Sequence, residues 1–293
     1  MHTLCQPQLL LPAAPFGRAL SFRIEPDGRA AEALNRMRRG MPLAWGVLGV
    51  GEPLTRALGC TLAGLRTFPA LSGAACGAPS SQHALWVMLH GDDRGTLFDR
   101  SRTLTALAGA DLGLVDVIDT FVYAGGRDLT GYEDGTENPT HEAAVAAALI
   151  DRQDALRGGS FVAVQRWTHD LNRFHAFPPA QRDATIGRRV DTNAELADAP
   201  HSAHVKRSAQ ESFEPPAFML RRSMPWISAH EQGLEFIAYG ASLDRFERVL
   251  RRMLGLEDGV VDALFNFSRP VTGGYYFCPP VASGQLDLRC LGL

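Results

Sequence analysis

Two short stretches decide the fold of this chain, residues 18–24 (RALSFRI) and residues 160–166 (SFVAVQR). Both are rich in apolar residues, and the second combines the β-branched and aromatic side chains that strands favour. Each stretch opens one half of the chain, and helices and further strands follow it in a similar order. The two stretches therefore predict a protein that is built from two similar halves.

The first half continues after its opening strand with a turn at Pro26-Asp27-Gly28 and a helix over residues 30–39. A stretch rich in Gly, Ala, Ser and Pro, residues 71–81, indicates a loop. The other elements expected here are strands over residues 45–50, 84–89 and 116–123 and a helix over residues 96–107.

The second half repeats this order of elements without detectable sequence identity to the first. After the strand at 160–166 we expect a polar helical segment over residues 179–188 and an amphipathic helix over residues 243–253. Further strands are expected over residues 218–221, 234–238 and 274–278. Mixed strands and helices in two similar halves predict the α+β class, with two α+β layers packed together.

The composition excludes several classes of protein. Hydrophobic residues make up 45% and charged residues 21% of the 293 residues, which is ordinary for a protein with a buried core. A net charge of -3 does not indicate a basic surface that would bind nucleic acid. No apolar run is long enough for a membrane helix. The N-terminal stretch lacks the basic residues of a secretory signal, and the five cysteines form no CxxC pair, so a cytoplasmic location is expected.

Three segments concentrate the residues that could perform chemistry. The first, residues 131–139 (GYEDGTENP), places the carboxylates of Glu133, Asp134 and Glu137 within five residues. Such crowding favours a perturbed pKa in one of them, and the glycines allow a sharp turn or a close approach to a ligand. A solvated acidic turn is the alternative, and the spacing excludes an EF-hand.

The second and third segments contribute histidines and arginines. Residues 201–207 (HSAHVKR) place His201 and His204 three apart, but Pro200 argues against a helix on which they would share a metal. Residues 219–226 (MLRRSMPW) run from an apolar strand into two arginines, which need an anionic partner unless they lie at a surface edge.

These segments belong to an ordered set of six, DLTGYEDGTENP, GGSFVAVQRWTHDL, TIGRR, SAHVKRS, FMLRRSMPW and PVTGGYYFCP, between residues 127 and 280. The set resembles the dye-decolourising peroxidase family and is most similar to its bacterial type B branch. The resemblance implies two ferredoxin-like α+β domains, residues 1–130 and a haem-binding domain at residues 131–293. Their antiparallel sheets would pack together as in a dimeric α/β barrel.

The resemblance also implies one haem b whose iron is bound by His204. Because Ser-Ala-His stands where the family usually has Ser-His, His201 is a rival ligand. An axial imidazole is tuned by a partner on its other nitrogen, for which Asp262 and Asn266, expected near the end of the last helix, are the candidates.

On the other side of the haem, the resemblance assigns acid–base work to Asp134 and charge stabilisation to Arg221, with Arg222 as the neighbour that an alignment could confuse with it. Ser223 stands where the family often has Asn, so an altered rate rather than a loss of activity is expected. Arg188 would form an ion pair with a haem propionate. The loop residues expected at the cofactor are Gly135, Thr136 and Glu137.

The function implied is that of a haem peroxidase, which reduces hydrogen peroxide and oxidises an organic donor such as a dye or a phenol. A haem carrier with little turnover and a cofactor-free α+β module are the alternatives. Bulky donors would need aromatic relays, for which Trp167, Tyr132 and Trp226 are candidates. The resemblance also implies a homo-oligomer, whereas the short apolar tail at residues 281–293 does not favour docking to an encapsulating shell protein.

Overall fold

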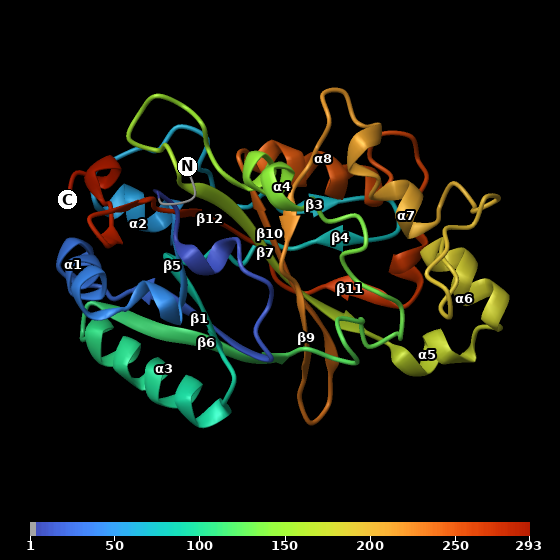
Figure 1. The fold of residues 1–293 in the computed structure, drawn as a ribbon, viewed down its shortest axis with the longest axis horizontal. Helices are drawn as coiled ribbons and strands as arrows, with labels where there is room; N and C mark the ends of the chain where they lie inside the picture. Colours follow the sequence, from blue (N-terminus) through green and yellow to red (C-terminus); the bar gives the residue numbers. More distant parts are fainter. Residues whose placement is uncertain (1–3) are drawn as a thin grey trace.

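Eight antiparallel strands close into a barrel in the computed structural model, which describes residues 4–293 (Figure 1). Around the barrel the order is β7-β12-β2-β5-β1-β6-β9-β10, and β10 pairs back with β7. The first-half strands are β1 (Phe16–Ile24), β2 (Gly46–Gly51), β5 (Leu85–Gly91) and β6 (Leu112–Phe121). Those of the second half are β7 (Ser160–His169), β9 (Met224–Ile227), β10 (Gln232–Gly240) and β12 (Gly274–Cys278).

The two halves share one strand order, which confirms the predicted pair of ferredoxin-like units. In each half the first and third strands of the chain lie in the centre, and the second and fourth lie at the edges. The halves meet edge to edge, through β2 with β12 and through the single pair of Thr120 with Trp226 between β6 and β9. Edge-to-edge joining leaves each sheet with an outer face that helices can cover.

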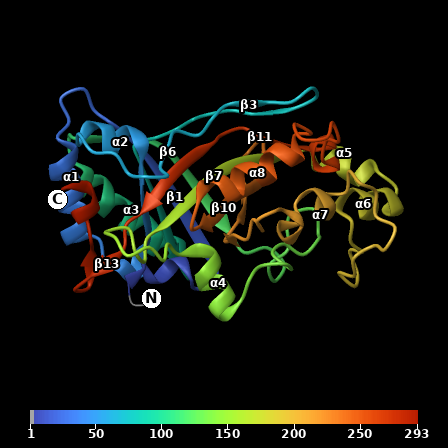
Figure 2. The same ribbon diagram turned by 90° about the horizontal axis from the view of Figure 1, so that it is seen from above.

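Helices cover these outer faces. The first half carries α1 (Ala30–Gly40), α2 (Glu52–Ala57) and α3 (Arg94–Ala108), and the second carries α8 (Leu243–Met253), which contacts β7 and β10 (Figure 2). Shorter helices gather at the far end of the second half, namely α5 (Leu171–Ala176), α6 (Pro179–Ile186) and α7 (His204–Arg207) (Figure 1). The helix α4 (His141–Ala148) contacts β8 (Leu220–Arg221) and β10.

The remaining elements are short. The hairpin of β3 (Leu71–Ser72) and β4 (Gly77–Ala78) lies within the stretch that was expected to be a loop, and β11 (Ser268–Pro270) pairs with β7. After β12 the chain forms a hairpin of β13 (Val281–Ala282) and β14 (Gln285–Leu286), and β14 contacts α1. The C-terminal tail therefore packs against the first half.

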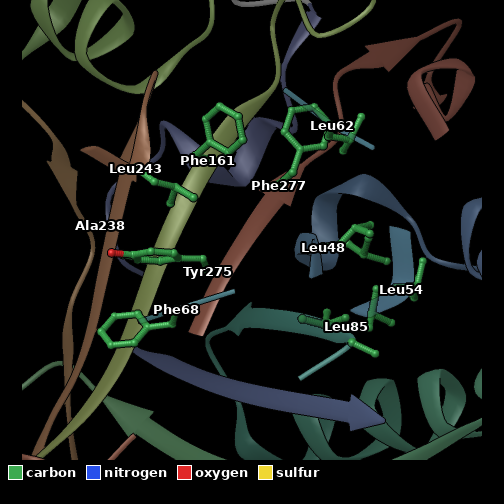
Figure 3. Close-up of a cluster of buried hydrophobic side chains, with 14 of the residues drawn as sticks. Leu48, Leu54, Leu62, Phe68, Leu85, Phe161, Ala238, Leu243, Tyr275 and Phe277 are labelled. Atoms are coloured by element: carbon green, nitrogen blue, oxygen red, sulfur yellow. The ribbon is translucent and has the colours of Figure 1, made fainter. Parts of the chain in front are cut away.

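Alternating side chains divide the core into two layers. On β2, Leu48 belongs to the cluster beneath the helices (Figure 3), whereas Val47 belongs to the cluster that also contains Trp86 and Tyr276. Because the helices cover the outside, this second cluster fills the barrel interior. Residues of α4 and of the segment before β1 join it, so they close the barrel at one end.

We expect Leu48→Ala to lower the free energy of unfolding by about 2–5 kcal/mol, because the removed methyl groups leave a cavity in a fully buried layer. The matched control is Leu114→Ala on β6, where the side chain is 39% exposed and little packing is lost. Denaturant unfolding followed by circular dichroism measures both. Equal losses in the two variants would contradict the assignment of Leu48 to the core.

Some expected elements differ from the structure. The strand expected over residues 218–221 is only two residues long, because the chain then turns so that β9 can pair with both β6 and β10. Neither β9, which contains Pro225, nor α4 was expected. The domain division at residue 130 stays a prediction. None of the helices described in residues 4–293 is both long and apolar enough to span a membrane.

Candidate active site

A cavity of about 130 Å³, partly open to solvent, lies between α8 and the outer face of β7 and β10. Its apolar wall includes Trp167, Leu234, Phe236, Phe246, Leu250 and Met253. Three residues expected in the site, Asp134, His204 and Arg221, also line it. They lie up to 87 residues apart in the sequence and come together because β8, α7 and the loop before α4 meet over the second sheet.

His204 is the first residue of α7 and is held by a buried carboxylate. Its Nδ1 lies 2.8 Å from Oδ2 of Asp262, whose side chain has no exposed surface. Asp262 also caps the 3-10 helix Ala263–Asn266 by accepting from the backbone N–H of Leu264, which fixes the carboxylate in place. Burial by itself would lower the pKa of His204, but the charge and hydrogen bond of Asp262 outweigh it and raise this pKa.

These contacts favour His204 over His201 as the ligand, and Asp262 over Asn266 as its partner. Since Asp262 engages Nδ1, Nε2 is the ring nitrogen of His204 that is left for a ligand. His201 is exposed and does not line the cavity. The residues after Ala203 do form one helical turn, contrary to the expectation drawn from Pro200, and Asp262 lies beyond α8 rather than near its end.

Asp134 faces the cavity from the loop between β6 and α4. Its backbone N–H donates to the carbonyl of Gly126 at 3.3 Å, which closes the loop on itself. Gly135 follows at φ +80°, a left-handed conformation that favours glycine. Burial raises the pKa of Asp134, although the positive charge of Arg221 opposes the shift. The carboxyl group can therefore exchange a proton at a higher pH than an exposed aspartate.

Asn138 joins this loop to Arg221, a role that the sequence did not reveal. Its amide nitrogen donates to the backbone carbonyl of Arg221 at 3.0 Å, and its amide oxygen accepts the backbone N–H of the same residue at 2.9 Å. These two bonds hold β8 against the loop, so the side chains of Asp134 and Arg221 are placed together.

The structure also separates the two neighbouring arginines. Arg221 lines the cavity, and its buried Nε finds no hydrogen-bond partner among residues 4–293. Arg222 points the other way and donates to the backbone carbonyls of Leu10 and Leu11 at 2.9 and 2.7 Å. The side chain available to a ligand in the cavity is therefore that of Arg221.

Other expected residues lie outside the cavity lining. The hydroxyl of Ser223 accepts the backbone N–H of Ile237 at 3.3 Å. Arg188 is ion-paired with Glu137 at 2.6 Å, and the hydroxyl of Thr136 accepts from the Asn193 amide at 2.9 Å. The roles assigned to these residues stay predictions, since each is engaged within the protein.

The three aromatic candidates for electron relays occupy different positions. Trp167 and Tyr132 line the cavity, and the Tyr132 hydroxyl donates to Asp183 at 2.5 Å. Trp226 lies in β9 and donates its indole N–H to the backbone carbonyl of Trp167 at 3.1 Å. Trp226 is therefore in direct contact with a residue of the cavity wall.

Haem fits the chemistry of this cavity. Within residues 4–293, no three His, Cys, Asp or Glu side chains are grouped so that they could hold a metal ion by themselves. Buried side-chain nitrogens of Gln165, Trp167 and Arg221 lack partners in the same part of the chain. Apolar walls with a few unpartnered donors suit a flat, mostly apolar cofactor that carries polar groups.

Comparisons with known proteins agree with this geometry. The family described as Dyp-type peroxidase, C-terminal, matches residues 125–283. A dye-decolorizing peroxidase of Rhodococcus erythropolis is 30% identical over 272 residues, which cover 89% of this chain and 75% of that relative. One from Mycobacterium tuberculosis is 30% identical over 224 residues, which cover 74% of this chain and 67% of the relative.

Solved structures give the same result. A dye-decolorizing protein from V. cholerae has a TM-score of 0.84 at 28% identity and covers 97% of this chain and 98% of its own. A Rhodococcus jostii RHA1 DypB variant in complex with haem has a TM-score of 0.86 at 28% identity, covering 92% and 94% of the two chains. Fold and site together define the class of haem-dependent peroxidases. Within that class, the chain belongs to the Dyp-type peroxidase family.

Asp262→Asn is expected to weaken haem binding by roughly 10–100-fold, because the amide cannot supply the charge that orients and polarises the His204 ring. Titration of the haem-free protein with hemin, followed by absorbance, measures the change. Asp111→Asn is a control, since that carboxylate pairs with Arg36 of α1 and makes no contact with the helix that carries His204. An unchanged affinity in Asp262→Asn would contradict the importance of this contact.

Proposed function

We propose that this chain holds haem b in the cavity through His204 and uses hydrogen peroxide to oxidise an organic donor of dye or phenol type. The observation that carries the proposal is that His204 with Asp262, and Asp134 with Arg221, meet in a single apolar cavity. Membership of the Dyp-type family supports both the reaction class and the cofactor.

On the proximal side, His204 Nε2 would bind the iron. Asp262 accepts a hydrogen bond from His204 Nδ1 and so fixes the orientation and tautomer of the ring. Its charge makes the imidazole a stronger electron donor. When bound, haem would supply a redox centre that can give two electrons to peroxide and regain them from the organic donor.

On the distal side, Asp134 and Arg221 would have separate roles in the reaction with peroxide. Ionised Asp134 takes a proton from one peroxide oxygen and delivers it to the other, which leaves as water. Arg221 stabilises the negative charge that develops on the leaving oxygen, and a guanidinium keeps its own charge throughout. The apolar walls strengthen both interactions by excluding water.

The roles of the loop residues belong to the same proposal. Arg188 would release its present partner Glu137, which is exposed at the surface, and pair with a haem propionate instead. Gly135 and Thr136 would line the approach to the cofactor. Ser223, held by the backbone of β10, would alter the rate relative to the usual Asn without abolishing activity.

Location and assembly are also proposals. Cys60, Cys76, Cys278 and Cys290 are free thiols, and this supports a reducing compartment such as the cytoplasm. Similarity to the family supports a homo-oligomer.

Stopped-flow absorbance of the haem-loaded protein after peroxide addition tests the reaction. We expect a fast shift of the Soret band that is reversed when a phenolic donor is added. A carrier with little turnover would give only slow bleaching and no donor-dependent recovery, and that result would reject the peroxidase proposal.

A further inference from the structure

A second carboxylate, Asp128, lies in the wall of the same cavity as Asp134. It accepts three hydrogen bonds: one from the backbone N–H of Thr130 at 2.8 Å, one from the Thr130 hydroxyl at 2.6 Å, and one from His169 Nε2 at 3.2 Å. A carboxylate with this many donors is stable in its ionised form even when it is buried.

His169 connects this carboxylate to the sheet. It is the last residue of β7, it is buried, and its Nδ1 lies 2.6 Å from the hydroxyl of Ser268 on β11. Because an ionised carboxylate only accepts, the proton between His169 and Asp128 resides on Nε2. The hydrogen bonds that link Thr130, Asp128, His169 and Ser268 therefore anchor the loop to the rigid barrel.

These hydrogen bonds of Asp128 also restrain Asp134, because both aspartates belong to one compact turn. The N–H of Asp128 donates to the carbonyl of Tyr132 at 2.9 Å, and its own carbonyl accepts from Gly131 at 2.8 Å. The N–H of Asp134 in turn donates to the carbonyl of Gly126. A displacement of Asp128 would consequently displace Asp134.

The environments of the two carboxyl groups shift their pKa values in opposite directions. Burial would raise the pKa of Asp128, but hydrogen bonding to His169 and Thr130 outweighs burial and lowers it. The pKa of Asp134 is raised by burial, and the negative charge of Asp128 adds to this shift. The titratable and charged groups that share the cavity wall with Asp134 are Asp128, Tyr132, Glu133, His169, His204 and Arg221.

We propose that Asp128 is a positioning residue: through His169 and Thr130 it anchors the turn that carries Asp134, and it places a second negative charge in the cavity wall beside that residue. This inference rests on the proposed function for the meaning of Asp134 in the reaction with peroxide. The coupling between the two carboxyl groups is a property of the polypeptide and can be measured without turnover.

Asp128→Asn tests the charge, because the amide keeps the shape and one acceptor oxygen. Carbon-13 NMR of the carboxyl groups in the haem-free full chain follows the titration of Asp134, whose signal is assigned by its loss in Asp134→Asn. We expect the midpoint of Asp134 to fall by roughly one pH unit in Asp128→Asn. Asp111→Asn, which removes a remote carboxylate paired with Arg36, should leave it unchanged. An unmoved midpoint in Asp128→Asn overturns the inference.

The haem-loaded protein gives a second readout. The rate of reaction with peroxide should decline at acid pH as Asp134 is protonated, and this decline should move to lower pH in Asp128→Asn. A wild-type profile with no acid decline would reject the proposed role of Asp134, while the NMR titration would still decide the coupling. The two failures are therefore distinguishable.

His169 supplies a matched pair of variants that does not remove the carboxylate. His169→Gln keeps an N–H donor for Asp128, whereas His169→Leu keeps the volume but donates nothing. We expect hydrogen exchange at the Asp134 amide to be faster in His169→Leu than in His169→Gln, with equal circular dichroism. Equal exchange in the two variants would overturn the anchoring role, even if Asp128→Asn failed to fold.

Discussion

His204→Ala is expected to abolish haem retention. Among residues 4–293, His204 is the histidine whose ring lines the cavity with a nitrogen left for a ligand and is held by a buried carboxylate, Asp262. Apolar contacts with the cavity walls would remain, but they cannot replace the bond to iron. Purified His204→Ala protein reconstituted with hemin and passed through gel filtration should show no Soret band.

Two variants serve as controls for this result. Asp134→Asn leaves His204 and its partner Asp262 in place and should retain haem. His201→Ala should also retain haem, because His201 is exposed and lies outside the cavity lining. Retention by His204→Ala at the wild-type level, or loss in His201→Ala alone, would refute the ligand assignment.

The second large effect is expected for Asp134→Asn, which should slow the reaction with peroxide by roughly 10²–10⁴-fold. The amide occupies the same space but cannot take a proton from one peroxide oxygen and return it to the other. Stopped-flow rates with the haem-loaded variant measure the loss. A rate within a factor of two of the wild type would remove Asp134 from the proton transfer.

The pH dependence of the same reaction follows from the raised pKa of Asp134. The group must be ionised to accept a proton, so the wild-type rate should fall as the pH drops through this pKa. Since the pKa is raised, the decline should begin at a higher pH than for an exposed aspartate. In Asp134→Asn the acid decline should disappear, and its persistence would show that another group titrates.

The neighbouring arginines offer a matched comparison for the distal charge. Arg221→Leu removes a cation from the cavity and should cost roughly 10²–10³-fold in the peroxide step. Arg222→Leu removes a guanidinium that binds the backbone near Leu10 and Leu11, so its main effect should be on stability. Similar kinetic losses in both variants would contradict the proposed orientation.

Much of the fold could be predicted from local patterns. The apolar, β-branched and aromatic content of residues 18–24 and 160–166, and the helical spacing of Leu243, Phe246 and Leu250, gave strands and helices that the structure confirms. The weakest predictions were those that depended on pairing across the molecule. The strand β9 contains a proline and is only four residues long, and its pairing with both β6 and β10 closes the barrel.

The sequence by itself pointed to three residues that line the cavity, Asp134, His204 and Arg221, because short motifs carry their own chemistry: a carboxylate next to a glycine, a histidine, and an arginine at a strand end. Tertiary structure alone decided which of them face each other. It placed Asp262 against His204, Asn138 against the Arg221 backbone, and Asp128 against His169. These partners lie between 41 and 83 residues apart. Contacts over such separations depend on how the two sheets close into a barrel, which no local pattern of residues encodes.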